Sequence, residues 1–334
     1  MSNDLRRKLL LSLVFALLVY IALVFYGDWR QLTVSLSTFP WAVLGPVLGL
    51  TLLNYGGRAL RWHWYMQLLG VPISRRDSLR VFGVGMLMVM TPGKAGEFLK
   101  SYMIKNIAGT PMSVTAPAPL AERMLDGAAM LLLAAVGLFV FPNATARVVA
   151  LLVLAVFVVF VVVVQVRPLA LWLLGIGERL PVVNRFAAHL HRFYESATIL
   201  FGMRNLTIGV LVGVVCWGAE GIAYYLVLVG FGVTPGADVL MVAVFIFCIS
   251  TVIGAAVALP GGLGGMEGSL VALSGQLLAM SAASATAAAL LIRFCTLWLG
   301  VLVGVVSFLV WSSLLTGSAR VEVGTEVIDR AGAS

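Results

Sequence analysis

Six stretches of this chain are long and apolar enough to cross a lipid bilayer, and they constrain its fold more than any other feature. A membrane-spanning helix needs about 20 mainly apolar residues. The stretches lie at about 9–26, 40–57, 115–141, 147–166, 206–231 and 283–315. Only 11% of the 334 residues are charged and 61% are hydrophobic, whereas soluble domains carry about 25% charged residues. We therefore expect an all-α polytopic membrane protein. A soluble enzyme, a nucleic-acid-binding domain and a disordered chain are excluded.

Two further apolar regions, at about 79–106 and 238–280, are interrupted by proline and glycine. The breaks are Pro92, Gly93 and Gly96 in the first region and Pro260, Gly261, Gly262 and Gly265 in the second. Proline and glycine at this density interrupt helices. Broken backbone at membrane depth must be satisfied by protein or by a water-filled cavity. These regions are thus expected to form two re-entrant helix hairpins beside about six full transmembrane helices. The alternative is eight or more spans, with hairpin legs that cross the membrane.

The distribution of lysine and arginine predicts the orientation. Most of the 22 basic residues fall in loops on the same side as the N-terminus, and short cytoplasmic loops are the ones enriched in Lys and Arg. We expect a multi-pass protein of a bacterial inner membrane with both termini in the cytoplasm. Residues 1–315 form one membrane domain, 167–205 an amphipathic linker on the cytoplasmic leaflet, and 316–334 a polar cytoplasmic tail. The net charge of +8 then reflects orientation and not a nucleic-acid partner.

The two interrupted regions also share a charge pattern. Glu97 is followed 26 residues later by Arg123, and Glu267 is followed 26 residues later by Arg293. Each half then contains a helix, a broken hairpin and a helix that carries arginine, within about 40–141 and 206–315. The predicted topology gives the two halves opposite directions. Inverted repeats with discontinuous helices are typical of secondary transporters.

Ionisable residues at membrane depth are the candidate binding residues. A charge at the bilayer centre costs about 2.5–3.5 kcal/mol on insertion scales, so Glu97, Arg123, Glu267 and Arg293 are expected to face one another or a hydrated cavity. Asp126 belongs to the same set. In the functional interpretation, the arginines bind an anionic lipid headgroup through its phosphate, and the glutamates pair with the arginines and gate access. In the alternative interpretation, the charges are structural ion pairs that hold the hairpins in place.

Several other residues receive a narrower interpretation. Arg58 and Arg61 lie at the inner end of an expected span, where snorkelling to the interface is the default, and both are also candidates for binding substrate. His63, His189 and His191 have no acids or cysteines at ligand spacing, so no metal is expected. The segment Gly93–Ala95 lacks the spacing of a nucleotide-binding loop, so neither ATP hydrolysis nor a cofactor is expected.

Taken together, several motifs resemble the lysylphosphatidylglycerol synthase transmembrane family, also called the flippase-like domain family. The motifs are Gly57–Trp62, "TPGKAGEFLKSYMI", "AERMLDG", and "LPGGLGGMEGSL" followed by Arg293. The resemblance covers about residues 8–315. It implies a membrane domain that moves lipids between leaflets, best known for aminoacylated phosphatidylglycerol. Other members resemble proteins of glycolipid and polyprenyl-lipid handling. Bifunctional members carry a soluble synthase domain after the membrane part, and only about 19 polar residues follow here, so we expect this chain not to be the synthase.

The resulting hypothesis is a lipid translocase, not an enzyme, that works without ATP hydrolysis. Its substrate would be an anionic phospholipid, an aminoacyl-phospholipid or a polyprenyl-phosphate-linked lipid. Three alternatives stay open: an integral membrane transferase that acts on a lipid, a non-transporting assembly subunit of a glycolipid pathway, and a small-anion transporter. Membrane lipids are the expected partners, and a homodimer or a lipid-modifying enzyme partner is left open.

Overall fold

The structure is a computed structural model that describes residues 18–22, 24–26, 28–91, 96–138, 155, 187–257, 259–312 and 314. Every regular element within these ranges is helical. The predictions for the span 147–166, for Pro92 and Gly93, for most of the span 9–26, and for the tail 316–334 lie outside the described residues.

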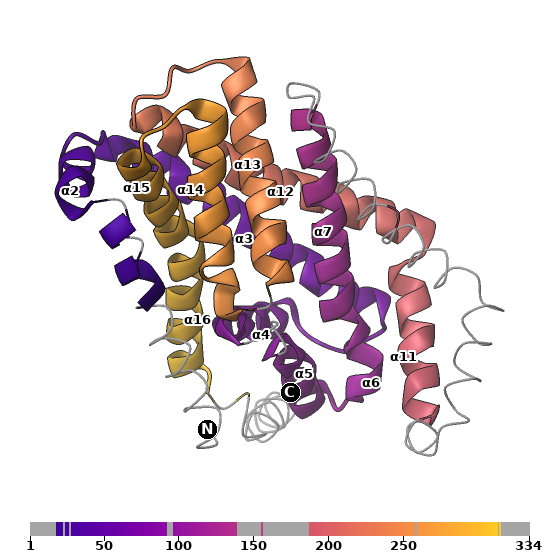
Figure 1. Ribbon diagram of the computed structural model, residues 1–334. Coiled ribbons are helices and arrows are strands. Elements are labelled where there is room, and N and C mark those ends of the chain that lie inside the picture. The colour runs from indigo at the N-terminus through magenta and orange to yellow at the C-terminus, as the bar shows by residue number, and fades with distance from the viewer. Residues whose placement is uncertain are drawn as a thin grey trace.

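The helices of each half follow one another in a similar order. The first half contains α2 (Trp29–Ser37), η1 (Trp41–Val43), α3 (Leu44–Leu68), α4 (Arg75–Met86), η2 (Leu87–Met90), α5 (Leu99–Ala108), α6 (Met112–Thr115) and α7 (Pro117–Leu138). After the linker helix α11 (Ala187–Leu200), the second contains α12 (Met203–Gly230), α13 (Ala237–Ala256), η4 (Pro260–Gly262), α14 (Gly265–Leu278), α15 (Ala282–Arg293), the π-helical turn η5 (Phe294–Trp298) and α16 (Leu299–Val310). Figure 1 shows α13, α14 and the continuous α15–α16 rod side by side, with α7 next to α13.

Three of the described helices are long and apolar enough to cross a membrane: α12, α13 and the rod Ala282–Val310. A fourth span results if α2 and the helix Trp41–Leu68, which meet at 78°, count as one. Helix α7 has the length, at 22 residues, but carries Glu122, Arg123 and Asp126. The protein is therefore an all-helical membrane protein, and the count of six full spans stays a prediction.

The two interrupted regions differ in the length of their first legs. In the first region, α4 has 12 residues and α5 has 10, so at 1.5 Å per residue each is about 15–18 Å long and too short to cross alone. In the second region, α13 has 20 residues and reaches about 30 Å. The expectation of a half-helix there is wrong for this leg, because α13 continues without a break until Ala256, just before the Pro260 turn. This agrees with the alternative in which a leg crosses.

Helices α3 and α12 pack against each other in opposite directions. Near the start of α3, Phe39 contacts Gly230 at the end of α12. Further along, the Asn54 side chain donates a hydrogen bond to the Cys216 carbonyl at 3.0 Å. Later still, Arg61 donates to the Gly209 carbonyl at 3.2 Å. Residue numbers rise along α3 while those of the partners in α12 fall, so the two helices are antiparallel.

Each half also packs the first leg of its broken region against the other half. Helix α4 and η2 lie against α16, where a Cβ on Gly304 would come within 2.3 Å of the Leu87 backbone nitrogen. In the same way, α13 lies against α7. The two breaks meet, because η2 contacts η4 and a Cβ on Gly261 would lie 3.3 Å from Met90 Sδ. The halves are thus interlocked around the breaks.

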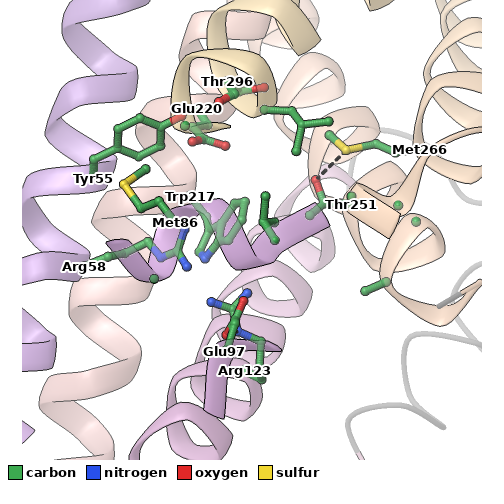
Figure 2. Close-up of a pocket in the computed structure, with 18 of the residues that line it drawn as sticks. Tyr55, Arg58, Met86, Glu97, Arg123, Trp217, Glu220, Thr251, Met266 and Thr296 are labelled. Carbon is green, nitrogen blue, oxygen red and sulfur yellow. Dashed lines mark hydrogen bonds and ion pairs between the residues drawn. The ribbon is translucent and has the colours of Figure 1, made fainter. Parts of the chain in front are cut away.

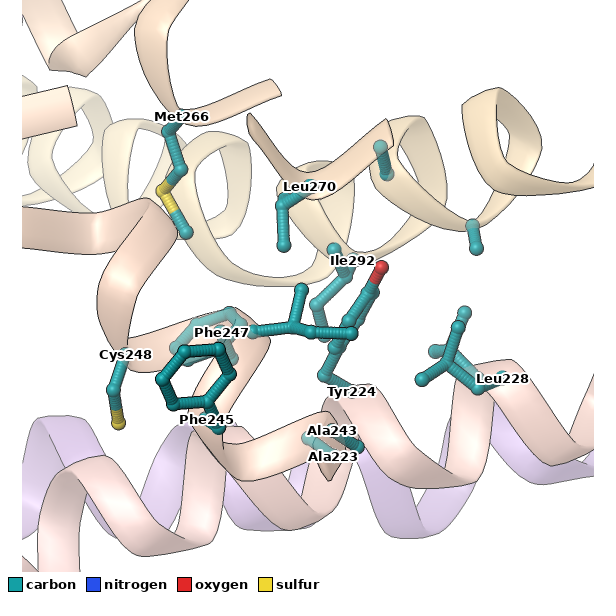
Figure 3. Packing of buried hydrophobic residues seen from close by; sticks show 14 of the residues in the cluster. Ala223, Tyr224, Leu228, Ala243, Phe245, Phe247, Cys248, Met266, Leu270 and Ile292 are labelled. Carbon is teal, nitrogen blue, oxygen red and sulfur yellow. The ribbon is translucent and has the colours of Figure 1, made fainter. Parts of the chain in front are cut away.

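The largest hydrophobic cluster joins α12, α13, α14 and α15 (Figure 3). Tyr224 is fully buried within it, and its hydroxyl is hydrogen-bonded to Ser274 Oγ at 2.7 Å. A second cluster includes Ala197, Leu200 and Phe201, from the part of the 167–205 linker that the structure describes. That part, α11, packs against α6 and α7. Residues 167–186 of the linker lie outside the described ranges.

Candidate functional site

A cavity with charged walls lies at the junction of the two halves (Figure 2). It encloses about 880 Å³ of empty space, its opening included. Its charged lining residues are Arg58, Glu97, Lys100, Arg123, Glu220 and Arg293. These side chains come from α3, the segment before α5, α5, α7, α12 and α15. Four basic and two acidic groups therefore face one space between helices that are otherwise mostly apolar.

The first predicted Glu–Arg pair is formed and faces the cavity. Arg123 Nε lies 3.0 Å from Glu97 Oε2, and Arg123 Nη2 lies 3.8 Å from Asp126 Oδ2. Arg123 and Asp126 are three residues apart on α7, which puts both on one face of that helix. The Arg123 side chain is 26% exposed and that of Asp126 only 1%. The three charges are brought together as the sequence predicts, with Asp126 behind the cavity wall.

Arg61 is buried, which corrects the snorkelling interpretation. Helix α3 continues to Leu68, past the end of the expected span, and carries Arg61 and Trp62 into the second hydrophobic cluster. Arg61 Nη2 donates to Asp126 Oδ1 at 2.5 Å, and the Arg61 side chain is 0% exposed. Because a buried charge needs a partner, Arg61 neutralises Asp126. It does not line the cavity, so its candidacy as a contact to substrate is not supported by its position.

Arg58 lies one helical turn before Arg61 and does line the cavity. Its Nε is 3.8 Å from Asp126 Oδ2, and its guanidinium lies 5.8 Å from the ring centroid of Trp217 on α12. This cation–π contact places the charge at the cavity wall. Figure 2 shows Arg58 reaching towards Trp217, with Glu97 and Arg123 beside each other nearby.

Lys100 was not expected at the site. It is buried on α5, pairs with Glu122 of α7 and lies 4.4 Å from the ring centroid of Trp62. The signal available in the sequence was its three-residue spacing from Glu97, which places both on one face of a helix. Glu122 and Asp126 are four residues apart on α7. Glu122 pairs with Lys100 of α5, and Asp126 pairs with Arg61 of α3.

The second predicted pair is also formed, but it is enclosed. Arg293 Nε donates to Glu267 Oε1 at 2.6 Å, and Nη2 donates to the Gly261 carbonyl at 2.6 Å. Arg293 Nη1 lies 3.0 Å from Met266 Sδ. The other Glu267 oxygen accepts from the Gly264 N–H at 2.7 Å. Arg293 thereby ties α15 to the turn that starts α14, and its side chain is 6% exposed.

Glycine breaks shape this turn. Gly261, Gly262 and Gly264 all have positive φ, at 62°, 68° and 81°, a conformation that side chains with a Cβ rarely adopt. Gly261 and Gly262 line the cavity, whereas Gly265 and Gly96 do not. A Cβ on Gly265 would lie 2.9 Å from Val257, so that glycine serves close packing of α13 and α14.

Polar residues that no motif had indicated complete the lining. The Tyr55 hydroxyl donates to the Thr296 carbonyl in the π-helical turn η5. Single π-helical turns are frequent at functional sites. Tyr55, Thr251 and Thr296 all face the cavity. They belong to apolar stretches without a distinctive spacing, and only packing reveals their shared position.

The fold and this site define an all-helical membrane protein with an internal charged cavity. The model of the family described as Lysylphosphatidylglycerol synthase TM region matches residues 9–304. The chain belongs to this family, as the sequence motifs predict. It is similar to a UPF0104 membrane protein of Methanothermobacter thermautotrophicus, with 26% identity over 337 aligned residues, 94% of this chain and 96% of that protein. A second UPF0104 membrane protein of that organism is 24% identical over 263 residues, 72% of this chain and 77% of that protein.

Proposed function

We propose that this protein is a lipid translocase that moves a phosphate-bearing lipid between leaflets without ATP hydrolysis. The observation that carries the proposal is the charged cavity of about 880 Å³ at the junction of the two halves. A charged headgroup needs polar surroundings to cross a bilayer, and this cavity supplies four basic side chains at its walls. An anionic phospholipid, an aminoacyl-phospholipid and a polyprenyl-phosphate-linked lipid all have the required phosphate.

An inverted-repeat architecture supports a transport role. Several matched positions around the two hairpins share an offset of 170: Glu97 and Glu267, Arg123 and Arg293, and the starts of α6 and α15 at Met112 and Ala282. The second hairpin helices α5 and α14 both end on a left-handed residue, Gly109 and Ala279, at the same offset. Together with the antiparallel packing of α3 on α12, these matches favour two repeats in opposite directions, as many secondary transporters have.

In the proposed mechanism, the headgroup enters the cavity while the acyl or prenyl tails stay in the bilayer. The contact between the breaks at η2 and η4 would serve as the pivot about which one half rocks against the other. The protein itself would form no covalent bond with the lipid. We place it in a bacterial inner membrane with both termini in the cytoplasm. A homodimer and a lipid-modifying enzyme partner remain predictions.

The test is a leaflet-exchange assay in proteoliposomes. Fluorescent phosphatidylglycerol in the outer leaflet is bleached by dithionite, and exchange exposes the inner pool. Ala255 lines the cavity and is itself exposed, so Ala255→Trp fills the space without disturbing buried packing. Ala282, exposed at the start of α15, gives the matched control Ala282→Trp. Exchange by the wild type and the control, with loss in Ala255→Trp, supports the proposal. Exchange no faster than in protein-free vesicles contradicts it.

A further inference from the structure

The two symmetry-related arginines of the cavity differ in how completely their N–H groups are satisfied. All three nitrogens of Arg293 have acceptors in the second half of the chain: Glu267, Met266 and the Gly261 carbonyl. In contrast, Arg123 Nε and Nη2 are buried without a hydrogen-bond acceptor among the described residues. The contact between Arg123 Nε and Glu97 at 3.0 Å is an ion pair without hydrogen-bond geometry.

Two neighbours of Arg123 share this property. Arg58 Nε and Trp217 Nε1 are also buried N–H groups without an acceptor in the described part of the chain, and both residues line the same cavity. The Trp217 side chain is 7% exposed and lies in the cavity wall. Buried donors in native structures nearly always have a partner, and each exception calls for an explanation such as an absent ligand. Four such nitrogens on one cavity wall match a group rich in acceptor oxygens.

We infer that Arg58, Arg123 and Trp217 form the binding subsite for a phosphate ester, and that Arg293 is a structural lock which does not contact it. The inference rests on the proposed function and deepens it by assigning the site to the first half alone. A phosphate offers several anionic oxygens to guanidinium and indole donors, and charge-assisted hydrogen bonds to arginine are short and strong. Arg61 holds one oxygen of Asp126 by a hydrogen bond, whereas Arg58 and Arg123 approach the other oxygen only at 3.8 Å, which is too far for a hydrogen bond.

Glu97 has a distinct role in this arrangement. Its carboxylate lies against Arg123 in the place that an arriving phosphate oxygen would take. The ligand must therefore displace Glu97 from Arg123, and Glu97 sets the affinity by competition. Neutralising Glu97 should therefore strengthen binding of the phosphate. If the ion pair only held the structure together, neutralising Glu97 would weaken binding instead.

The experiment measures binding by calorimetry with the purified full chain in detergent micelles. The probes are dioctanoylphosphatidylglycerol, dioctanoylglycerol without phosphate, and inorganic phosphate. We expect R58Q and R123Q each to weaken binding of the phospholipid by about tenfold or more, since each removes charge-assisted donors. W217F, which keeps an aromatic ring but removes the indole N–H, should weaken it by less, and E97Q should tighten it. R80Q, at an exposed arginine outside the cavity, is the matched control and should bind as the wild type does.

The outcomes separate this inference from the proposed function. If inorganic phosphate binds and the variants change its affinity in the same pattern, the subsite is supported and its ligand can be a soluble phosphate. If only the phospholipid binds, the subsite is supported and its ligand is a lipid headgroup. Wild-type affinity in folded R58Q and R123Q, equal binding of dioctanoylglycerol, or weaker binding in E97Q overturns it. Leaflet exchange that persists in R58Q and R123Q would overturn the subsite and leave translocation standing. Absence of exchange in the wild type, with the variant pattern intact, would overturn only translocation.

Discussion

Removing Arg293 tests whether the enclosed ion pair holds the second hairpin in place. Arg293→Met keeps much of the side-chain volume but removes the hydrogen bonds to Glu267 and to the Gly261 carbonyl, both at 2.6 Å. The substitution leaves Glu267, which is 0% exposed, as a buried charge without its partner. Breaking a buried pair in this way costs about 3–5 kcal/mol, so we expect that loss in the free energy of unfolding.

The double variant Arg293→Met with Glu267→Gln tests whether the loss of stability comes from a buried charge without its partner. Glu267→Gln keeps an acceptor for the Gly264 N–H and removes the charge, which leaves Arg293 as the isolated ion. Once both charges are gone, neither is stranded, so the double variant should be more stable than the sum of the single losses by about 1–3 kcal/mol. The matched control is the partly exposed pair of Arg80 and Asp77, which are 3.0 Å apart. Arg80→Met there should cost less than about 1 kcal/mol.

Unfolding by SDS in mixed micelles, followed by far-UV circular dichroism, measures these free energies. The comparison requires the wild type, the two single variants and the double variant of the Arg293–Glu267 cycle, together with the control Arg80→Met, under one detergent condition. A loss in Arg293→Met no larger than in Arg80→Met would refute the assignment of Arg293 as a structural lock. Strict additivity in the double variant would refute the ion pair as its cause.

Three further predictions concern other parts of the fold. Gly304→Ala should destabilise the protein by about 1–3 kcal/mol in the same unfolding assay, because the new Cβ would lie 2.3 Å from the Leu87 nitrogen. Gly49→Ala, with nothing within 4 Å, should not, and equal effects would contradict the tight contact between η2 and α16. Tyr224→Phe should cost about 1 kcal/mol by loss of the buried hydrogen bond to Ser274, and Ser274→Ala should add little to it; full additivity would contradict a shared bond. Ser74→Cys, between α3 and α4, and Pro235→Cys, between α12 and α13, test the orientation: a membrane-impermeant maleimide should label Ser74→Cys only from the cytoplasmic side and Pro235→Cys only from the outer side, and the reverse pattern would show that the topology is inverted.

Local features of the sequence were sufficient to predict several parts of this protein. The apolar stretches predict α12 and the α15–α16 rod nearly to their ends, because a helix in lipid must satisfy its own backbone and show an apolar surface. The 26-residue spacing groups Glu97 with Arg123 and Glu267 with Arg293 as two matching sets. Charges this costly at membrane depth must find opposite charges nearby. Because the chain has few such charges, few pairings are possible.

The tertiary structure alone decided how deep each charge lies and how fully it is satisfied. Arg61 and Lys100 occur in sequences typical of helix ends and loops, yet the packing of α3 on α12 and of α5 on α4 buries both. Arg123 and Arg293 each follow a glutamate by 26 residues. Arg293 meets a turn whose backbone carbonyl and carboxylate complete its hydrogen bonds, whereas two nitrogens of Arg123 find no hydrogen-bond acceptor among the described residues. That difference arises from contacts between segments far apart in the chain, which no local pattern encodes.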